Sequence, residues 1–174
     1  VNEILDLSKV ESGKMEFTWI DVSPADIATE ITNLHRAPAE TKGLTLSLQL
    51  ADDLPPTMVT DATRLRQVLN NLLSNAVKFT EQGGIAVSVS LSGDYLRFAV
   101  RDSGPGIPAE ARSLVFEKFK QLEHFVTRSH EGTGLGLALV KQLSEHMGGR
   151  VALESEVGVG STFIVELPVK ASNV

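Results

Sequence analysis

The chain has 174 residues, of which 42% are apolar, and this is enough to bury the core of one good-sized domain. Its formal net charge of −6, without long basic runs, argues against a nucleic-acid-binding surface. It has no cysteine, which excludes disulfides and thiolate metal sites, and no apolar run long enough for a membrane span. No signal-peptide pattern is present. Because Val1 lies within a helical pattern, we expect the chain to be a piece of a longer protein.

Periodicity predicts the elements of the first half of the chain. They are a helix over 1–12, a strand over 15–22, a helix over 23–43 and a strand over 44–50. The first helix stops at Gly13 and is too short to be stable alone, so its apolar stripe needs a partner. The second helix opens with Ser23 as its N-cap and Pro24 in its first turn.

The second half alternates helices and strands in the same way. The predicted elements are a helix over 61–80, strands over 83–92 and 94–102, a short helix within 107–119, a loop over 118–131, a helix over 135–147, and strands over 150–156 and 161–169. The two strands that meet at Gly93 should pair as a hairpin. Helices and strands mixed in one compact unit predict an α/β sandwich with helices on one face of a sheet.

A polar stripe marks the helix predicted over 61–80. Asn71, Asn75 and Lys78 fall within an arc of roughly 60°, opposite the apolar side of this helix. Asparagine is a poor helix former, by about 0.5 kcal/mol relative to alanine, yet Asn70 is a third mid-helix asparagine. Side-chain amides can coordinate a hard cation, and a lysine one turn away can hold phosphate. The stripe alone supports two interpretations about equally, a solvated helix face and a ligand site. The glycine loops downstream favour the ligand site.

Two glycine-containing turns follow strands. Asp102, Gly104 and Gly106 lie where a predicted strand runs into a loop. The glycines let the backbone approach a ligand closely, and a strand-end carboxylate can accept from an amino group such as that of adenine. Gly160 and Thr162 repeat the theme at a turn between the last two strands. Taken singly, each motif is also typical of an ordinary turn.

A third glycine motif, Gly132-Thr133-Gly134-Leu135-Gly136-Leu137, opens the helix predicted over 135–147. It places unpaired N–H groups and the positive end of the helix dipole where a polyphosphate could bind. It lacks the spacing of a dinucleotide fingerprint, and no Gly-Lys-Ser/Thr completes a P-loop. A tight loop before a helix is the other interpretation of this motif.

In combination, these motifs resemble the catalytic and ATP-binding domain of sensor histidine kinases of two-component systems. The N, G1, F, G2 and G3 boxes of that family occur in this order across residues 71–163. The segment ILDLSKVESGKM resembles the end of the second helix of the family's dimerisation hairpin. The resemblance implies hairpin residues over 1–14, the catalytic domain over 15–170 and a frayed tail over 171–174. It also implies a Bergerat-type fold, an α/β sandwich with a mixed sheet covered on one face by about three helices.

The resemblance implies a role for each box. Asn75 is expected to ligate Mg²⁺, with Asn71 and Lys78 close to the phosphates of ATP. Asp102 is expected to bind the adenine amino group, and the F box to anchor the 118–131 loop as a lid. The cofactor-binding residues that the resemblance implies are Asp102, Gly104, Gly106, Phe116, Phe119, Gly132, Gly134, Leu135, Gly136, Leu137 and Thr162.

The residue four positions before the metal-binding asparagine bears on the reaction. ATP-hydrolysing relatives carry a glutamate there as the general base on water. Here the position is Asn71, whose amide cannot take a proton, so phosphate transfer to a histidine is favoured over hydrolysis. The family's acceptor histidine lies on the hairpin, upstream of this chain. His130 resembles an acceptor box only superficially, and His35 and His146 fall in predicted helices, so we expect ATP binding without substantial autophosphorylation.

The resemblance also implies partners. These are the protein's own dimerisation hairpin with its phosphoacceptor histidine and the receiver domain of a response regulator, with no nucleic acid. The full-length protein is expected to be a homodimer, this chain a monomer, and the domain cytoplasmic with a parent that can be anchored in the inner membrane. The sequence leaves open the stimulus, the cognate regulator and a hybrid architecture.

Two other interpretations stay open. One is a non-catalytic, nucleotide-dependent interaction domain of a degenerate kinase. The observation against it is that all five boxes retain their polar residues. The other is a gyrase-like or chaperone-like ATPase, which Asn71 and the hairpin-like N-terminus oppose.

Overall fold

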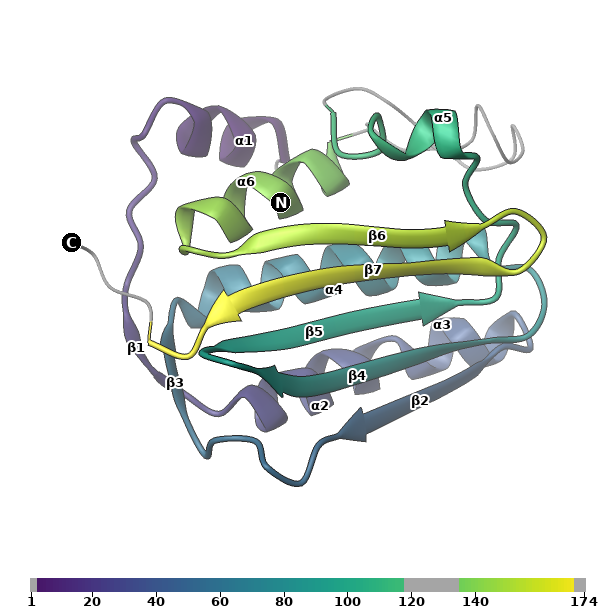
Figure 1. Ribbon diagram of the computed structural model, residues 1–174, viewed down its shortest axis with the longest axis horizontal. Coiled ribbons are helices and arrows are strands. Elements are labelled where there is room, and N and C mark those ends of the chain that lie inside the picture. Colours follow the sequence, from purple (N-terminus) through teal and green to yellow (C-terminus); the bar gives the residue numbers. More distant parts are fainter. Residues whose placement is uncertain (1–2, 118–134, 171–174) are drawn as a thin grey trace.

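The computed structural model describes residues 3–117 and 135–170, which form a sheet with helices packed against it (Figure 1). The elements in chain order are α1 (Glu3–Glu11), β1 (Ile20–Val22), α2 (Pro24–Leu34), α3 (Arg36–Thr41), β2 (Thr45–Leu50), β3 (Met58–Thr60), α4 (Ala62–Phe79), β4 (Gly84–Ser92), β5 (Tyr95–Asp102), α5 (Ala109–Arg112), α6 (Gly136–His146), β6 (Arg150–Glu156) and β7 (Gly160–Pro168). Apart from the division of one predicted helix into α2 and α3 and the additional strand β3, these follow the predicted order.

The main sheet has five strands in the order β2-β4-β5-β7-β6. β2 pairs with β4 in parallel, and every other pair is antiparallel, so the sheet is mixed. In Figure 1 the helices α2 and α4 lie behind one face of this sheet, and α6 lies alongside β6, in contact with both β6 and α4. The predicted α/β sandwich, with a mixed sheet covered on one face by about three helices, is confirmed.

The core lies between this sheet and α4. The residues of α4 that are buried are Leu65, Val68, Leu69, Leu72, Leu73, Ala76 and Val77, all of them on the predicted apolar side. Phe98 and Val100 of β5 are both fully buried on the facing side of the sheet. Because α4 is held along its whole apolar side, its polar stripe has a fixed direction relative to the ends of the strands.

The helix predicted over 23–43 is two helices, and this corrects the sequence-based prediction. Ser23 caps α2 as expected, with its hydroxyl accepting from Asp26 N at 3.1 Å. The chain then breaks at His35, and α3 begins at the next residue. In a continuous helix Pro38 would clash with the carbonyl of Leu34 and would lack the N–H that bonds to it. The break puts Pro38 in the first turn of a new helix, where proline is tolerated.

The strand predicted over 15–22 is also wrong in extent, because only its last three residues form β1. β1 pairs with β3, a three-residue strand that the sequence analysis did not predict. Before β1, the N–H of Thr18 donates to the Asp61 carboxylate at 2.8 Å instead of to a neighbouring strand. The alternation of apolar residues over 15–22 thus reflects burial on one side without a partner strand along its length.

The short helix α1 finds the partner that the sequence required. Leu7 and Val10 are buried in the core, whereas Ile4 and Leu5 are each 57% exposed. The helix packs against α6 (Figure 1). Among the described residues, no helix combines the length and the apolar content that crossing a membrane requires.

Candidate nucleotide-binding site

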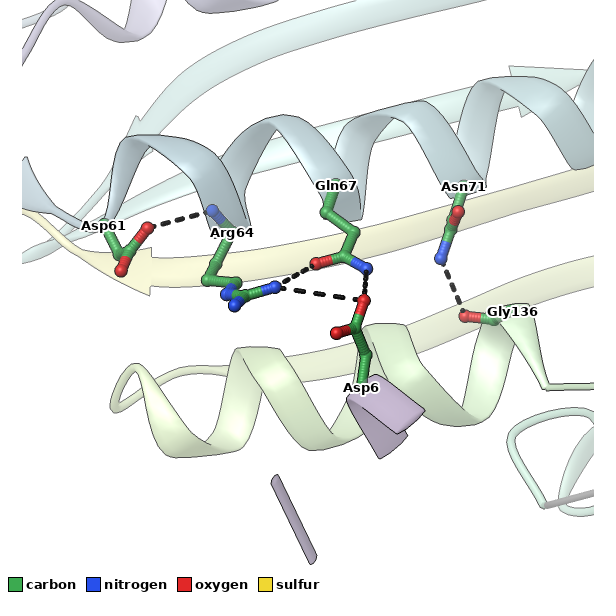
Figure 2. Close-up of polar contacts among 6 residues, drawn as sticks. All are labelled: Asp6, Asp61, Arg64, Gln67, Asn71 and Gly136. Atoms are coloured by element: carbon green, nitrogen blue, oxygen red, sulfur yellow. Dashed lines mark hydrogen bonds and ion pairs between the residues drawn. The ribbon is translucent and has the colours of Figure 1, made fainter. Parts of the chain in front are cut away.

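The polar stripe of α4 continues toward the start of the helix through Gln67, Arg64 and the cap residue Asp61, and this first half of the stripe is bound by the protein itself (Figure 2). Asp61 caps the helix by accepting from the backbone N–H of Arg64 at 3.0 Å through one carboxylate oxygen. Its other oxygen accepts from the N–H of Thr18. The Asp61 side chain is buried, so this cap both satisfies the helix start and fixes the segment that leads into β1.

One turn further along, α4 is joined to α1 by a polar network (Figure 2). Gln67 donates through Nε2 to Asp6 Oδ2 at 2.8 Å and accepts from Arg64 Nη1 at 2.9 Å. The same Arg64 nitrogen lies 4.0 Å from the Asp6 carboxylate. This network therefore holds the hairpin-like N-terminal helix against the helix that carries the asparagines.

Asn71 connects the stripe to α6. Its Nδ2 donates to the carbonyl oxygen of Gly136 at 3.3 Å, as Figure 2 shows. Gly136 is the first residue of α6, and the N–H groups in the first turn of a helix have no partner within that helix. The contact thus brings the polar stripe next to a helix N-terminus, an arrangement suited to binding phosphate.

A pocket opens beside the second half of the stripe, between α4 and the ends of β5 and β7. The residues that line it are Asn75, Ala76, Phe79, Asp102, Pro105, Gly106, Ile107, Ser161 and Phe163. Asn75, Asp102 and Gly106 were predicted as site residues from widely separated parts of the sequence. The fold brings these three into one pocket.

Asp102 is the acid of this pocket and the last residue of β5. Burial raises the pKa of Asp102, and backbone N–H groups of Gly104 and Ser161 oppose this by stabilising the charged form. The N–H of Gly104 donates to Asp102 Oδ1 at 2.9 Å. A carboxylate fixed in this way is an acceptor held ready for an amino group in a mostly apolar pocket.

Gly106 is required where the loop after β5 crosses the turn between β6 and β7. Its φ is +79°, and a Cβ there would lie 2.2 Å from the carbonyl oxygen of Glu156. The same turn donates from Gly158 N to Pro105 O at 2.8 Å. A side chain at position 106 would therefore push the loop off the turn and change the wall of the pocket.

Ser161, which the sequence analysis did not select, lies in the pocket, and Thr162 is not among the lining residues. Ser161 is directly opposite Asp102 in the β5–β7 pairing. Successive side chains of a strand point to opposite faces, so Thr162 points away from Ser161 and Phe163. Ser161 lies two residues before the buried Phe163, and residues two apart in a strand share a face. This alternation was the signal that could have identified Ser161.

The remaining predicted residues differ in position. Lys78 does not line the pocket, but its Nζ lies 5.3 Å from the ring centroid of Phe79, which does. Phe116 makes an edge-to-face contact with Phe163, with ring centroids 6.1 Å apart, and so supports the pocket from behind. Leu135 and Leu137 are buried around the start of α6. The predicted Phe119, Gly132, Gly134 and the 118–131 lid lie outside the described residues.

The donors in the described part of the chain fit a loosely held, hard cation. Asn75 lines the pocket, and its side-chain amide carries an oxygen, which is the kind of ligand that Mg²⁺ prefers. The described residues contain no group of three or more His, Asp or Glu that could hold a metal ion. Mg²⁺ at Asn75 would therefore take most of its ligands from water and phosphate, as is usual for Mg²⁺ bound with a nucleotide.

Comparison with known proteins identifies the family of this chain. Residues 60–171 match the family described as histidine kinase-, DNA gyrase B- and HSP90-like ATPase. The sensor histidine kinase RcsC of Escherichia coli is 40% identical over 169 residues, covering 97% of this chain and 18% of that protein. The circadian input-output histidine kinase CikA of Synechococcus elongatus is 45% identical over 170 residues, covering 97% of this chain and 22% of that protein. The chain thus spans about a fifth of these curated relatives.

Solved structures show the same fold. Full-length ShkA in complex with AMPPNP is 34% identical with a TM-score of 0.88, covering 99% of this chain and 36% of that one. The nucleotide-free catalytic domain of the histidine kinase ThkA is 28% identical with a TM-score of 0.76, covering 90% of this chain and 97% of that one. The chain therefore belongs to the histidine kinase-, DNA gyrase B- and HSP90-like ATPase family, and corresponds within it to the ATP-binding catalytic domain of sensor histidine kinases.

Proposed function

We propose that this domain binds Mg²⁺-ATP in the Asp102 pocket and transfers the γ-phosphate to a histidine on the dimerisation hairpin of its own protein. The observation that carries the proposal is that Asp102 and Asn75, from two distant boxes, line one pocket. The carboxylate of Asp102 supplies an acceptor for the base, and the amide of Asn75 supplies an oxygen for a cation.

The base is held at the Asp102 end of the pocket. The carboxylate accepts from the exocyclic amino group of adenine, while apolar side chains such as Phe79 and Ile107 contact the ring. Guanine carries a carbonyl oxygen at the equivalent position, and two acceptors facing each other repel. The pocket is thus suited to an adenine nucleotide.

The phosphates extend along α4 toward α6. Asn75 would hold Mg²⁺, which neutralises phosphate charge during transfer. Asn71 is held 3.3 Å from the Gly136 carbonyl, so its amide lies beside the N–H groups that open α6. Lys78 supplies a positive charge on the same stripe.

Transfer to an imidazole is chemically better supported than hydrolysis. Asn71 stands where hydrolysing relatives carry a general base, and an amide cannot take a proton from water. A histidine nitrogen already has a lone pair, so the domain needs to position ATP and neutralise charge more than to move protons. The acceptor histidine and the receiver domain of a response regulator are the partners that we propose for the whole protein, together with its homodimerisation.

The test is phosphotransfer in trans. The chain is incubated with radiolabelled Mg²⁺-ATP and a separately produced dimerisation hairpin from its own parent protein, and label on the hairpin histidine is quantified. We expect acid-labile label on the hairpin and none on this chain. A hairpin His→Ala variant is the control. If ATP binds but no label is transferred, the domain is instead a nucleotide-dependent interaction module; strong label on this chain would contradict the proposed acceptor.

A further inference from the structure

A cluster of hydrogen bonds lies next to the pocket, where the loop after β5 meets the end of β6. The Ser155 hydroxyl accepts from the N–H of Ile107 at 2.8 Å. It also lies 2.7 Å from the hydroxyl of Ser161 and 3.0 Å from the carbonyl oxygen of Gly160. Because Ile107 and Ser161 both line the pocket, a single hydroxyl links two of its walls.

Arg112 of α5 holds the same junction from the other side. Its Nε donates to the carbonyl oxygen of Ile107 at 3.3 Å, and its Nη2 donates to the carbonyl oxygen of Ser155. β6 is an edge strand, so carbonyl groups along its outer side have no neighbouring strand to pair with. The planar guanidinium bonds one such group, the carbonyl of Ser155, and the loop carbonyl of Ile107, and it holds the two at a separation that the flexible ammonium of a lysine does not fix.

These bonds restrain a loop that otherwise has little regular structure. β5 ends at Asp102 and α5 begins at Ala109, so the pocket residues Pro105 to Ile107 lie in an irregular segment. A ligand that had to order this segment on binding would lose affinity through the entropy of ordering it. Bonds that fix the segment beforehand therefore favour binding without touching the ligand.

We propose that Ser155 and Arg112 are positioning residues of the base-binding pocket, setting the separation between the loop after β5 and Ser161. Neither side chain lines the pocket, so they act through Ile107 and Ser161. This inference rests on the proposed function, because it takes the adenine of ATP as the occupant of the pocket. It predicts that the two residues control the affinity for the nucleotide and leave the transfer of its phosphate untouched.

The experiment compares Ser155→Ala, Arg112→Ala and Arg112→Lys with the unmutated chain by calorimetric titration of ADP with Mg²⁺. We expect the dissociation constant to rise about 5- to 10-fold in both alanine variants. Arg112→Lys keeps one donor group, so we expect an intermediate value. The matched controls are Ser90→Ala on β4 and Arg66→Ala on α4, where Arg66 pairs with Glu30 at 2.9 Å away from the pocket. Neither control should change the affinity.

Kinetics separate positioning from a merely structural role. In the transfer assay with the hairpin, the KM for ATP should rise by the same factor as the ADP dissociation constant, with kcat unchanged. A lower melting temperature with an unchanged KM in Ser155→Ala and Arg112→Lys would overturn the inference, even if Arg112→Ala fails to fold. If the unmutated chain binds ADP and these variants bind it equally well, the inference alone fails. If the unmutated chain binds no nucleotide, the proposed function fails and the inference with it.

Discussion

The two halves of the polar stripe on α4 differ in what satisfies them. In the first half, Asp61, Arg64 and Gln67 are bound by the protein's own groups, including Asp6 of α1 (Figure 2). In the second half, Asn75 lines a pocket beside an acid. Both halves look alike in sequence, as polar residues at helical spacing. Whether a polar residue of this helix is structural or available to a ligand therefore depends on its partners and not on its residue type. We expect mutations in the two halves to have opposite effects on stability and on ligand affinity.

The largest effect is expected in the second half. Asn75→Ala should lower the affinity for Mg²⁺-ATP about 100-fold, equivalent to roughly 2.7 kcal/mol, because the proposed cation ligand is lost. The variant should not be less stable, since alanine is a better helix former than asparagine by about 0.5 kcal/mol. Calorimetric titration with and without Mg²⁺ checks the first expectation, and thermal unfolding checks the second. Equal affinity of the variant and the unmutated chain in Mg²⁺ would remove Asn75 from the site.

The first half should respond in the opposite way. Asp61→Ala removes the helix cap and the bond to Thr18, which should cost about 2 kcal/mol of unfolding free energy. For a chain of this size, the melting temperature should fall by about 4–8 °C. The affinity of the folded variant for ADP should stay within about twofold, measured well below its melting temperature. A selective loss of affinity without loss of stability would break the comparison.

The polar contact between α1 and α4 tests how much the first half of the stripe contributes to stability. Asp6→Ala removes the acceptor for Gln67 and the charge near Arg64, so we expect a loss of about 1 kcal/mol. The polar contact is half-buried, and Leu7 and Val10 still hold α1 in the core. Unfolding in urea measures the change, with Ser8→Ala on the exposed side of α1 as the control. A loss no larger than that of Ser8→Ala would show that the network contributes little.

The smallest effect is expected from the pocket acid in the absence of nucleotide. Asp102→Asn removes a carboxylate whose pKa is raised by burial from its ordinary value of 3.8. The unmutated chain therefore loses stability as the pH rises from that value through the raised pKa, and it carries the full cost at pH 7. The variant should melt slightly higher at pH 7, by a few degrees at most, and this gain should vanish below pH 3.8, where the acid is protonated in both states.

Asp53→Asn, on an exposed loop, is the control for this pH series. A variant Asp102→Asn that is less stable at pH 7 than the unmutated chain would mean that the bonds from Gly104 and Ser161 outweigh burial.

Much of this architecture could be predicted from local sequence. The apolar side of α4 and its aspartate cap follow from helical spacing and capping chemistry, and the β4–β5 hairpin follows from alternation around Gly93. Asp102 and Gly106 could be selected only from the order of the motifs along the chain, because alone their motif is also typical of an ordinary turn. The helix and the hairpin depend on residues close together in the chain.

The rest depends on contacts between distant segments. Nothing local shows that β2 pairs in parallel with β4, or that three residues at Met58 complete a small sheet with β1. The break at His35 follows from Pro38, which the spacing of apolar residues conceals. To identify Ser161 instead of Thr162 as a pocket-lining residue, one must know which face of the strand points inward. Ser155 and Arg112 contact the loop after β5 only because the fold brings these distant segments together.

The most direct test of the account is calorimetric titration of ATP, or of a non-hydrolysable analogue, into the unmutated chain and into Asp102→Asn, both with Mg²⁺. We expect saturable binding to the unmutated chain and a loss of affinity of at least about 30-fold in Asp102→Asn, which remains folded. Equal binding by both proteins would contradict the assignment of Asp102 to the base. Absence of binding by the unmutated chain would contradict the assignment of this pocket to ATP.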